Sequence, residues 1–238
     1  MRLHLHDDLM ISKKTGPTDL VTQMDQQVQK DLVEKITHRY PEDRIFAEEN
    51  GLRSPISEGS VWVIDPIDGT NNFVTQKEDF AVMVAYFEDG IGQFGLIYDV
   101  MRDHLFYGGG EFPVYRNEVE LTPFVDQPLE NLLIASNVGM LEKNDWGMAD
   151  LGMDSLGIRV YGSAGISFSK ILSGGILAYF SYIWPWDYAA AAIMGERLGY
   201  TVLNLNGDKP NYQSVEPIMM VPKVKLTEIQ TYLKKGRS

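Results

Sequence analysis

The stretch at residues 62–73, WVIDPIDGTNNF, restricts the local fold more than any other part of the sequence. A residue before proline is confined to extended backbone, so Asp65 is expected to finish a strand, and Pro66 fixes the next φ angle and starts a turn. Gly69 permits a positive φ and the close approach of a ligand to the backbone. The stretch therefore predicts a strand, a turn and then a helix that Thr70 would cap.

Two carboxylates of this stretch are expected to converge. Asp65 would project from the end of the strand, and Asp68 can reach back across the turn to the same point. Carboxylates this close repel each other unless a proton or a cation lies between them, and Mg²⁺ prefers oxygen ligands of this kind. The amides after Asp68 would then face an anion. An Asx-type turn before a helix would give the same sequence, so the motif alone leaves both interpretations open.

The first half of the chain is predicted to be a sheet with helical cover. An apolar pattern with helical spacing ends at Pro41 and places Asp25 on its apolar face; its members are Val21, Val28, Leu32 and Ile36. Further apolar runs predict strands over 44–50, 60–65, 80–87 and 91–100. Asp89 and Gly90 favour a hairpin turn between the last two runs.

The second half of the chain alternates between strand-like and helix-like patterns of apolar residues. Strands are predicted over 131–136, 158–162 and 176–183, and helices over 163–172, from Asp187 to about residue 200, and over 225–235. A boundary between Pro123 and Pro128 divides the chain into an N-terminal α+β half, 1–125, and a C-terminal α/β half, 126–238. The two halves are expected to form one compact unit, and the pattern suits an α/β layered sandwich.

Composition excludes several kinds of protein. The 238 residues include 21 Lys and Arg against 33 Asp and Glu, a formal net charge of −12, and no cysteine. The negative balance disfavours nucleic acid as a partner, because phosphate-backbone binding needs a basic face. Disulfides, thiolate metal sites and a cysteine nucleophile are excluded. No apolar run approaches the roughly 18 residues of a membrane span, and the first residues do not have the pattern of a signal peptide, so we expect a cytoplasmic protein without a membrane partner.

Acidic residues at the ends of three separate apolar runs point to a shared site. Each acid has a simpler explanation by itself, because the pair Glu48 and Glu49 could be a solvated loop and Asp187 could be an N-cap. These explanations do not account for Glu48, Asp65 and Asp187 all lying beside apolar sequence.

The chain resembles the inositol monophosphatase family of lithium-sensitive, Mg²⁺-dependent phosphatases. The matching segments are DLVTQMD (19–25), AEEN (47–50), WVIDPIDGTNNFV (62–74), PWDYAAAAIMGERLG (185–199) and, more weakly, YGSAG (161–165). Ala47 and Tyr200 replace glycines of the family pattern, and neither change removes a metal ligand. The resemblance implies an αβαβα sandwich of the inositol monophosphatase/fructose-1,6-bisphosphatase type, a site between its halves, a homodimer, and a shortened or missing N-terminal helix.

The resemblance also implies a role for individual residues. One Mg²⁺ would be held by Glu48, Asp65 and the carbonyl of Ile67, and a second by Asp65, Asp68 and Asp187, which places most ligands in the N-terminal half. Glu48 would help to hold a third, weaker ion, so two or three Mg²⁺ are expected per site. Thr70 with Asp25 would orient and deprotonate water, and Glu48 completes the implied catalytic set. Substrate contacts are implied for Asp68, Gly69, Thr70, Gly162, Ser163, Ala164, Ser181 and Asp187.

The function implied is Mg²⁺-dependent hydrolysis of a small phosphorylated metabolite similar to inositol monophosphate. Phosphatases for NADP, fructose-1,6-bisphosphate or phosphoadenosine phosphate are alternatives within the same class. A non-catalytic regulatory member is a second hypothesis, which the presence of all four acidic ligands and Thr70 disfavours. A carbohydrate-binding module using Trp62, Trp184 and Trp186 is a third, although aromatic residues beside strands are usually core.

The segment before Asp187 predicts that inositol phosphate is not the only substrate. Inositol-specific members of the family carry a glutamate there, whereas this chain has Phe180 and Ser181 at the candidate positions and no acid between Gly175 and Asp187. A serine accepts a weaker hydrogen bond than a carboxylate. An aromatic wall is expected instead, made of Tyr179, Phe180, Tyr182, Trp184 and Trp186.

Overall fold

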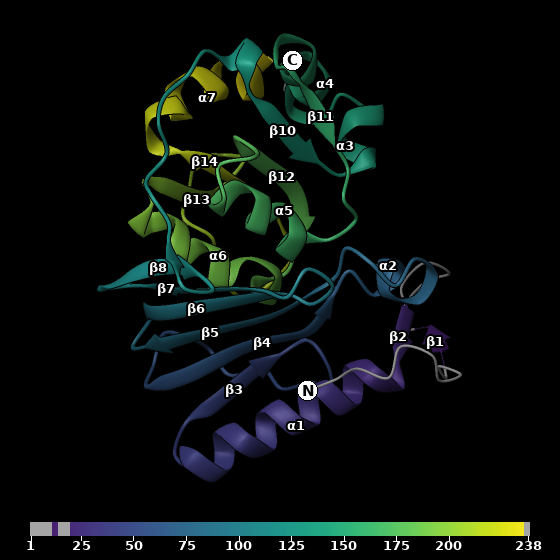
Figure 1. Cartoon of the computed structure of the whole chain (residues 1–238), viewed down its shortest axis with the longest axis vertical. Coiled ribbons are helices and arrows are strands. Elements are labelled where there is room, and N and C mark those ends of the chain that lie inside the picture. The colour runs from purple at the N-terminus through teal and green to yellow at the C-terminus, as the bar shows by residue number, and fades with distance from the viewer. Residues whose placement is uncertain (1–10, 14–19, 236–238) are drawn as a thin grey trace.

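A seven-stranded sheet forms one half of the protein. The computed structural model describes residues 11–13 and 20–235, and their helices and sheets form five alternating layers (Figure 1). The strand order of the larger sheet is β3(Arg44–Ala47), β4(Ser60–Asp68), β5(Ala81–Glu88), β6(Ile91–Asp99), β7(His104–Gly109), β8(Phe112–Arg116), β9(Val119–Glu120). Only β3 and β4 are parallel, and the other neighbours are antiparallel. A separate antiparallel pair joins β1(Ile11–Lys13) to β2(Leu20–Thr22).

A five-stranded sheet forms the other half. Its order is β11(Gly157–Arg159), β10(Leu133–Ser136), β12(Ala178–Ile183), β14(Glu216–Pro222), β13(Tyr200–Asn204). The β10 strand is parallel to both of its neighbours, and the pairs that involve β14 are antiparallel. Parallel neighbours need crossover connections, so this sheet is built from alternating strands and helices.

Helices form the remaining three layers. One outer layer is α1(Gln23–Arg39), which lies below the larger sheet, while α5(Ala164–Leu172) and α6(Pro185–Arg197) lie between the sheets (Figure 1). The other outer layer contains α3(Val138–Glu142), α4(Met148–Asp154) and α7(Leu226–Lys235). The short α2(Thr70–Thr75) follows β4 directly. This arrangement confirms the expected αβαβα sandwich.

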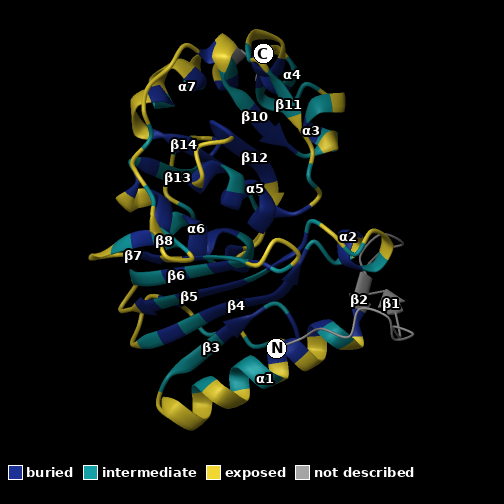
Figure 2. Ribbon diagram, viewed as in Figure 1, coloured by how far each residue is buried: buried dark blue, intermediate teal, exposed yellow. Residues whose placement is uncertain are grey.

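The central helix α6 lies close to the larger sheet because small residues line the contact. A Cβ atom at Gly95 of β6 would lie 2.3 Å from the carbonyl oxygen of Ala190, and one at Gly109 of β7 would lie 2.7 Å from that of Ile193. Figure 2 shows the inner strands and the two central helices as the most buried part of the protein. The close packing fixes the first turn of α6, which carries Asp187, against the sheet that carries Asp65 and Asp68.

Several local predictions differ from the structure. Val21 lies in β2, so α1 begins two residues after it. The strand that carries Asp65 does not finish there, because β4 runs on to Asp68 with a register shift. Gly69, with φ +88°, is the N-cap of α2, and Thr70 is the first helical residue. The N-cap of α6 is Trp184 rather than Asp187.

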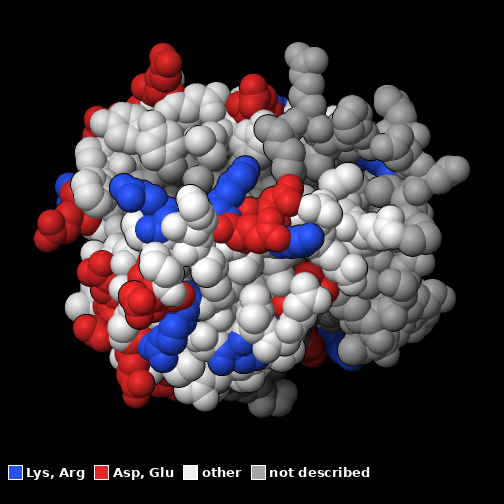
Figure 3. All heavy atoms as spheres, turned by 90° about the horizontal axis from the view of Figure 1, so that it is seen from below, with Lys and Arg blue, Asp and Glu red and all other residues white. Residues whose placement is uncertain are grey.

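The boundary between the halves stays a prediction. The larger sheet ends at Glu120 and the smaller one begins at Leu133, on either side of residues 125 and 126. One hydrophobic cluster nevertheless joins both sheets through α5 and α6, and it includes Val63, Ile171 and Ile218. The lower face, over α1 and the larger sheet, carries acidic and basic side chains side by side (Figure 3).

Candidate active site

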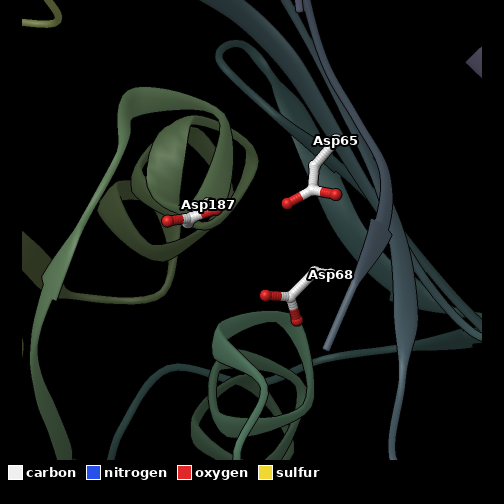
Figure 4. A group of neighbouring side chains, drawn as sticks. All are labelled: Asp65, Asp68 and Asp187. Carbon is white, nitrogen blue, oxygen red and sulfur yellow. The ribbon is translucent and has the colours of Figure 1, made fainter. Parts of the chain in front are cut away.

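Three aspartates converge where β4 meets the two central helices. Oxygen atoms of Asp65, Asp68 and Asp187 all lie within 4.8 Å of one another, and the side chains point into the same space (Figure 4). Asp65 is 1% exposed and Asp68 is 8% exposed, while Asp187 is half-buried. The predicted convergence of Asp65 and Asp68 is confirmed, and tertiary packing adds Asp187.

A bulge in β4 explains why two residues three positions apart face the same site. Side chains alternate along a regular strand, so Asp65 and Asp68 would otherwise point to opposite faces. In the ladder, Asp65 pairs with Met83 and Asp68 pairs with Ala81, so β4 has one residue more than β5 between these pairs. The extra residue reverses the alternation. Pro66 lies in the bulge, where its missing N–H removes no ladder hydrogen bond.

Asp187 is held by the first turn of α6. Pro185 is the first residue of this helix, and Asp187 is the third. Its Oδ2 atom accepts a hydrogen bond of 2.8 Å from the backbone N–H of Trp184. A carboxylate is favourable at this end of a helix, because the helix dipole places partial positive charge there. The Asp187 side chain also lies beside the other two aspartates (Figure 4).

Asp68 is anchored by the N-terminus of α5. The Ser163 hydroxyl and the N–H of Gly165 donate to its Oδ2 atom, the latter at 2.7 Å, and the N–H of Ala164 donates to Oδ1 at 3.1 Å. Gly69 is needed beside this contact, since a Cβ there would lie 2.9 Å from that of Ser163. Two of the predicted substrate contacts, Ser163 and Ala164, therefore bind Asp68 in this structure.

A hydrogen-bonded pair lies on the other side of the turn. The Thr70 hydroxyl is 3.1 Å from Asp25 Oδ1 and 3.0 Å from the Ile67 carbonyl oxygen. Asp25 is fully buried and also accepts bonds from the N–H and the hydroxyl of Thr22, at 2.8 and 2.5 Å, in a capping box that starts α1. The structure thus brings Thr70 and Asp25 together as the family resemblance implies.

Glu48 follows the end of β3 and is half-buried beside the three aspartates. Two residues that sequence analysis missed hold this segment. Gln29 of α1 exchanges two hydrogen bonds with the backbone of Glu49, at 2.8 and 2.9 Å. Arg53 donates to the carbonyl oxygens of Ala47, Leu52 and Glu48, which fixes the turn after β3. Neither residue type has a local sequence signal, because both act through contacts that only the fold creates.

Asn72 is a third residue that the sequence did not reveal. Its side-chain amide donates to the carbonyl oxygens of Tyr161 and Asp79, at 2.7 and 2.9 Å. Gly162 lies over Asn72, since a Cβ there would be 3.0 Å from its Oδ1 atom. Asn72 therefore ties the loop before α5 to the segment that follows β4.

Burial and mutual repulsion shift the titration of the three aspartates. Burial raises the pKa of Asp65 well above its ordinary value, and the charges of Glu48, Asp68 and Asp187 raise it further. Burial also raises the pKa of Asp187, with further contributions from Asp68 and Glu48. Burial raises the pKa of Asp68 as well, although its three hydrogen bonds to the start of α5 oppose the shift.

The donor set fits a hard divalent cation. The Oδ1 atom of Asp65 is buried and has no hydrogen-bond partner among the described residues. An unsatisfied carboxylate oxygen among other carboxylates is unfavourable without a cation or a proton. Three carboxylates, with Glu48 and the Ile67 carbonyl beside them, offer the oxygen ligands that Mg²⁺ binds.

Comparison with known proteins agrees with this geometry. The model of the inositol monophosphatase family matches residues 1–236. The chain belongs to the inositol monophosphatase family. Inositol-1-monophosphatase of Bacillus subtilis is 37% identical over 210 residues, which cover 86% of this chain and 79% of that protein. Human inositol monophosphatase 2 is 28% identical over 87% of this chain and 76% of its own.

Solved structures of the inositol monophosphatase family share the fold. An IMPase/NADP phosphatase complexed with Mg²⁺ and phosphate superimposes with a TM-score of 0.87 and 25% identity, covering 94% of this chain and 86% of its own. Staphylococcal IMPase-II superimposes with a TM-score of 0.83 and 31% identity, covering 89% of this chain and 82% of its own. Like these relatives, the protein is a phosphatase. Within the described residues, no helix is long and apolar enough to span a membrane.

The segment before Asp187 matches the expected aromatic wall only in part. Ser181 is buried and accepts a 3.1 Å hydrogen bond from the Asn137 amide. The expected aromatic wall is only partly present, because Phe180 belongs to the core on the opposite face of β12 and Tyr179 and Trp186 are also buried. Of the five residues of that wall, only Tyr182 and Trp184 are exposed, at 45% and 39%.

The three tryptophans proposed for carbohydrate binding do not share one surface. Trp184 and Trp186 stack at 4.8 Å between ring centroids and 10° between ring planes. Trp62 instead contacts aromatic residues on the outward face of the larger sheet, away from the central helices. The structure therefore gives no support to a tryptophan platform made of all three.

Proposed function

We propose that this phosphatase hydrolyses a small phosphomonoester by attack of a water molecule at phosphorus, with Mg²⁺ bound by Asp65, Asp68 and Asp187. The observation that carries the proposal is the buried Asp65 oxygen without a hydrogen-bond partner among the described residues, in a group of three aspartates whose oxygens lie within 4.8 Å. Glu48 and the Ile67 carbonyl would complete the ligand set. Two or three ions per site and a cytoplasmic homodimer belong to the same proposal.

Bound Mg²⁺ would neutralise phosphate oxygens, lower the pKa of water and stabilise the leaving alkoxide. The protein groups have separate tasks. The Thr70 hydroxyl, 3.1 Å from Asp25, would take a proton from the attacking water while it passes its own proton to Asp25 Oδ1. The new P–O bond forms as the bond to the leaving alkoxide breaks, and the alkoxide then takes a proton from solvent. The products are inorganic phosphate and the free alcohol, and Asp25 returns its proton to solvent.

Backbone amides would hold the phosphate oxygens. The N–H groups of Gly69 and Thr70 begin α2, so they face outward with no partner inside the helix. Gly69 has φ +88°, and this part of the backbone lies against the start of α5, where Gly162, Ser163 and Ala164 are found. We assign substrate contacts to these residues, to Ser181, and to Asp68 and Asp187.

Phosphate release with and without Mg²⁺ tests the function directly. A panel of inositol-1-phosphate, fructose-1,6-bisphosphate, NADP and phosphoadenosine phosphate is incubated with metal-stripped protein, and Mg²⁺ is then restored. We expect release only after Mg²⁺ is added. Release from none of these compounds in the presence of Mg²⁺ would contradict the proposed activity, and full activity in a chelator would contradict the metal site.

The substrate range is expected to be wider than inositol phosphate. Solved relatives include complexes with inositol monophosphate, NADP and 2'AMP. Ser181 offers a neutral acceptor, and a lost charge-assisted hydrogen bond corresponds to about 1.5–3 kcal/mol of discrimination. We expect similar kcat/KM for inositol-1-phosphate and a bulkier sugar or nucleotide phosphate. A preference for inositol-1-phosphate above about a hundredfold, near 2.7 kcal/mol, would overturn this expectation.

Lithium inhibition follows from the same ligand set. A staphylococcal inositol monophosphatase-1 has been solved as an inhibitory complex soaked in 100 mM LiCl. We expect Li⁺ to occupy the site of Asp65, Asp68 and Asp187 after hydrolysis and to slow product release. Titration of Li⁺ at fixed Mg²⁺ measures this, and undiminished turnover at millimolar Li⁺ would rule out this assignment without affecting hydrolysis.

A further inference from the structure

A hollow of about 290 Å³ opens on the outward face of the larger sheet, beyond the C-terminal end of α1. Nothing in the proposed phosphatase mechanism uses this hollow. Its walls are mainly aromatic, with two carboxylates, and are formed by Tyr40, Asp43, Trp62, Tyr86, Glu88, Gln93, Phe94 and Phe112. This volume is just below the usual range for small-ligand pockets, which begins at about 300 Å³.

Sheet register places the rings together. Trp62 pairs with Tyr86 across β4 and β5, and Tyr86 pairs with Phe94 across β5 and β6, so the three side chains share the outward face. The centroid of Trp62 lies 4.7 Å from that of Tyr86 and 5.7 Å from that of Phe94. Tyr40, the C-cap of α1, stacks on Trp62 at 5.7 Å. Phe112, which is 64% exposed, also lines the hollow.

Two acids are built into the aromatic group. The indole N–H of Trp62 donates to Asp43 Oδ2 at 2.8 Å, and the Tyr86 hydroxyl donates to Glu88 Oε1 at 2.8 Å. Within the described part of the chain, neither acid forms an ion pair. These hydrogen bonds fix both carboxylates beside the rings and leave their negative charges without a cation in contact.

The aromatic rings and the two carboxylates together indicate which kind of ligand would bind in the hollow. An apolar ligand would take two carboxylates out of water without supplying a positive charge, which is unfavourable. A small inorganic cation prefers a shell of oxygen ligands, which the rings do not supply. An organic ammonium ion satisfies both features, because its positive charge attracts the ring faces and the carboxylates while its methyl groups fill the apolar space. Arg39 already lies with its guanidinium carbon 5.8 Å from the Tyr40 ring centroid, outside the residues that line the hollow.

We propose that this hollow is a binding site for a small quaternary ammonium ion. The site is separate from the three aspartates. Trp62 points outward from β4, whereas Asp65, three residues later and before the bulge, points to the other face of the strand. A ligand in the hollow would therefore contact no group that holds metal or phosphate, and its binding is independent of the proposed reaction.

Binding of choline and tetramethylammonium to the full chain tests the proposal. The protein has four tryptophans, so the Trp62 indole N–H signal can be followed by NMR and assigned with Trp62→Phe. We expect saturable shifts of this signal by both cations. The neutral isostere of choline, 3,3-dimethylbutan-1-ol, is expected to bind about tenfold more weakly, because it lacks the cation–π and carboxylate attraction.

Two mild variants locate the site. Phe112→Ala and Glu88→Gln each should weaken choline binding severalfold while phosphatase activity is unchanged. Tyr107→Ala is the matched control, because Tyr107 is an exposed aromatic residue on the same sheet face that does not line the hollow. Equal affinity for the neutral isostere, no shift of the Trp62 signal at about 20 mM choline, or an equal loss in Tyr107→Ala would each overturn the proposal.

Discussion

The buried acid Asp25 and the group of converging aspartates lie on either side of the turn at Gly69, and their environments differ. Asp25 accepts hydrogen bonds from the Thr22 backbone, the Thr22 hydroxyl and the Thr70 hydroxyl. Asp65 is equally buried, but one of its oxygens has no hydrogen-bond partner among the described residues and its neighbours are other carboxylates. Burial alone therefore does not identify a metal ligand. The distinguishing feature is a buried acid that the protein itself leaves unsatisfied.

The environment of Asp68 is intermediate between those of Asp25 and Asp65. This residue belongs to the converging group, yet the Ser163 hydroxyl and two backbone N–H groups already bind its oxygens. Its hydrogen bonds oppose the rise in its pKa, whereas in Asp65 repulsion adds to the effect of burial. We therefore expect Asp65 to be the acid on which metal binding depends most.

The largest effect is expected from Asp65→Asn. A neutral amide at the centre of the group weakens every metal contact, so phosphatase activity should fall about a thousandfold, equal to about 4 kcal/mol in the barrier. The same change removes repulsion in metal-free protein, so its melting temperature should rise. Kinetics with Mg²⁺ and thermal melts in chelator measure the two effects. Activity within a few fold of the parent would contradict the two-metal proposal.

A matched control for Asp65→Asn is Asp99→Asn. Asp99 is also buried, but it pairs with Arg102 at 3.1 Å. Breaking a satisfied pair should lower the melting temperature of metal-free protein rather than raise it. Mg²⁺ should still raise the melting temperature of this variant. If the melting temperature in chelator rises for both variants, repulsion within the aspartate group is not the cause of the rise in Asp65→Asn.

The second effect is the pH dependence of stability without metal. The pKa values of Asp65 and Asp187 are raised in the folded state, so the folded protein holds protons that the unfolded chain has lost. The free energy of unfolding in chelator should therefore fall as pH rises above the ordinary aspartate range, by about 1.4 kcal/mol per pH unit for each proton that only the folded protein holds. Denaturant titrations across this range measure it. Saturating Mg²⁺ should flatten the slope, and a rise in stability with pH in chelator would contradict the assigned cause.

A smaller effect on stability is expected from Asp25→Ala. Loss of the capping box at the start of α1 should cost about 1–2 kcal/mol, and activity should fall because Thr70 loses its partner. The increase in melting temperature on adding Mg²⁺ should be retained. The control Thr22→Ala removes the cap but leaves the Thr70 contact, so it should lower stability with less loss of activity. Equal losses of activity in both would assign Asp25 a structural role only.

The smallest effect on stability is expected from Trp184→Ala, because this ring is 39% exposed. Among the exposed aromatic residues Trp184 is the nearest in sequence to Asp187, so kcat/KM for a nucleotide phosphate should fall about threefold to tenfold, and less for inositol-1-phosphate. Tyr182→Ala, which alters another exposed ring of the same segment, is the control. An equal loss for both substrates in Trp184→Ala would show that the ring does not contribute to substrate choice.

Much of the site was predictable because its motifs are local. Asp65 and Asp68 are three residues apart beside a proline, and this spacing correctly predicted that they converge. The prediction that the strand ends at Asp65 was wrong, since the chain continues through a bulge to Asp68. A proline after an acid signals a break in the ladder, but whether that break is a turn or a bulge depends on the pairing of the neighbouring strand.

Other parts of the site carried no local signal. Gln29, Arg53 and Asn72 hold the loops around the aspartates through contacts with backbone groups 20, 6 and 89 residues away in sequence. Amide and guanidinium side chains are common on protein surfaces, so their type predicts nothing without the fold. The Asx-turn explanation of the opening motif also had some basis, because Asp68 does accept backbone hydrogen bonds, although from α5 rather than from its own turn.

The sequence by itself determined the alternation of strands and helices, the five layers through the family resemblance, and the candidate acids, because periodicity and proline positions act over a few residues. Which of these acids are satisfied by hydrogen bonds depends on the tertiary structure. Asp25 and Asp65 are both acids within apolar sequence, yet long-range packing gives one of them three hydrogen-bond donors and gives the other two neighbouring carboxylates. Electrostatic energies in a buried site depend on distances of a few ångströms between separate elements, and those distances are set when the two sheets close on α5 and α6.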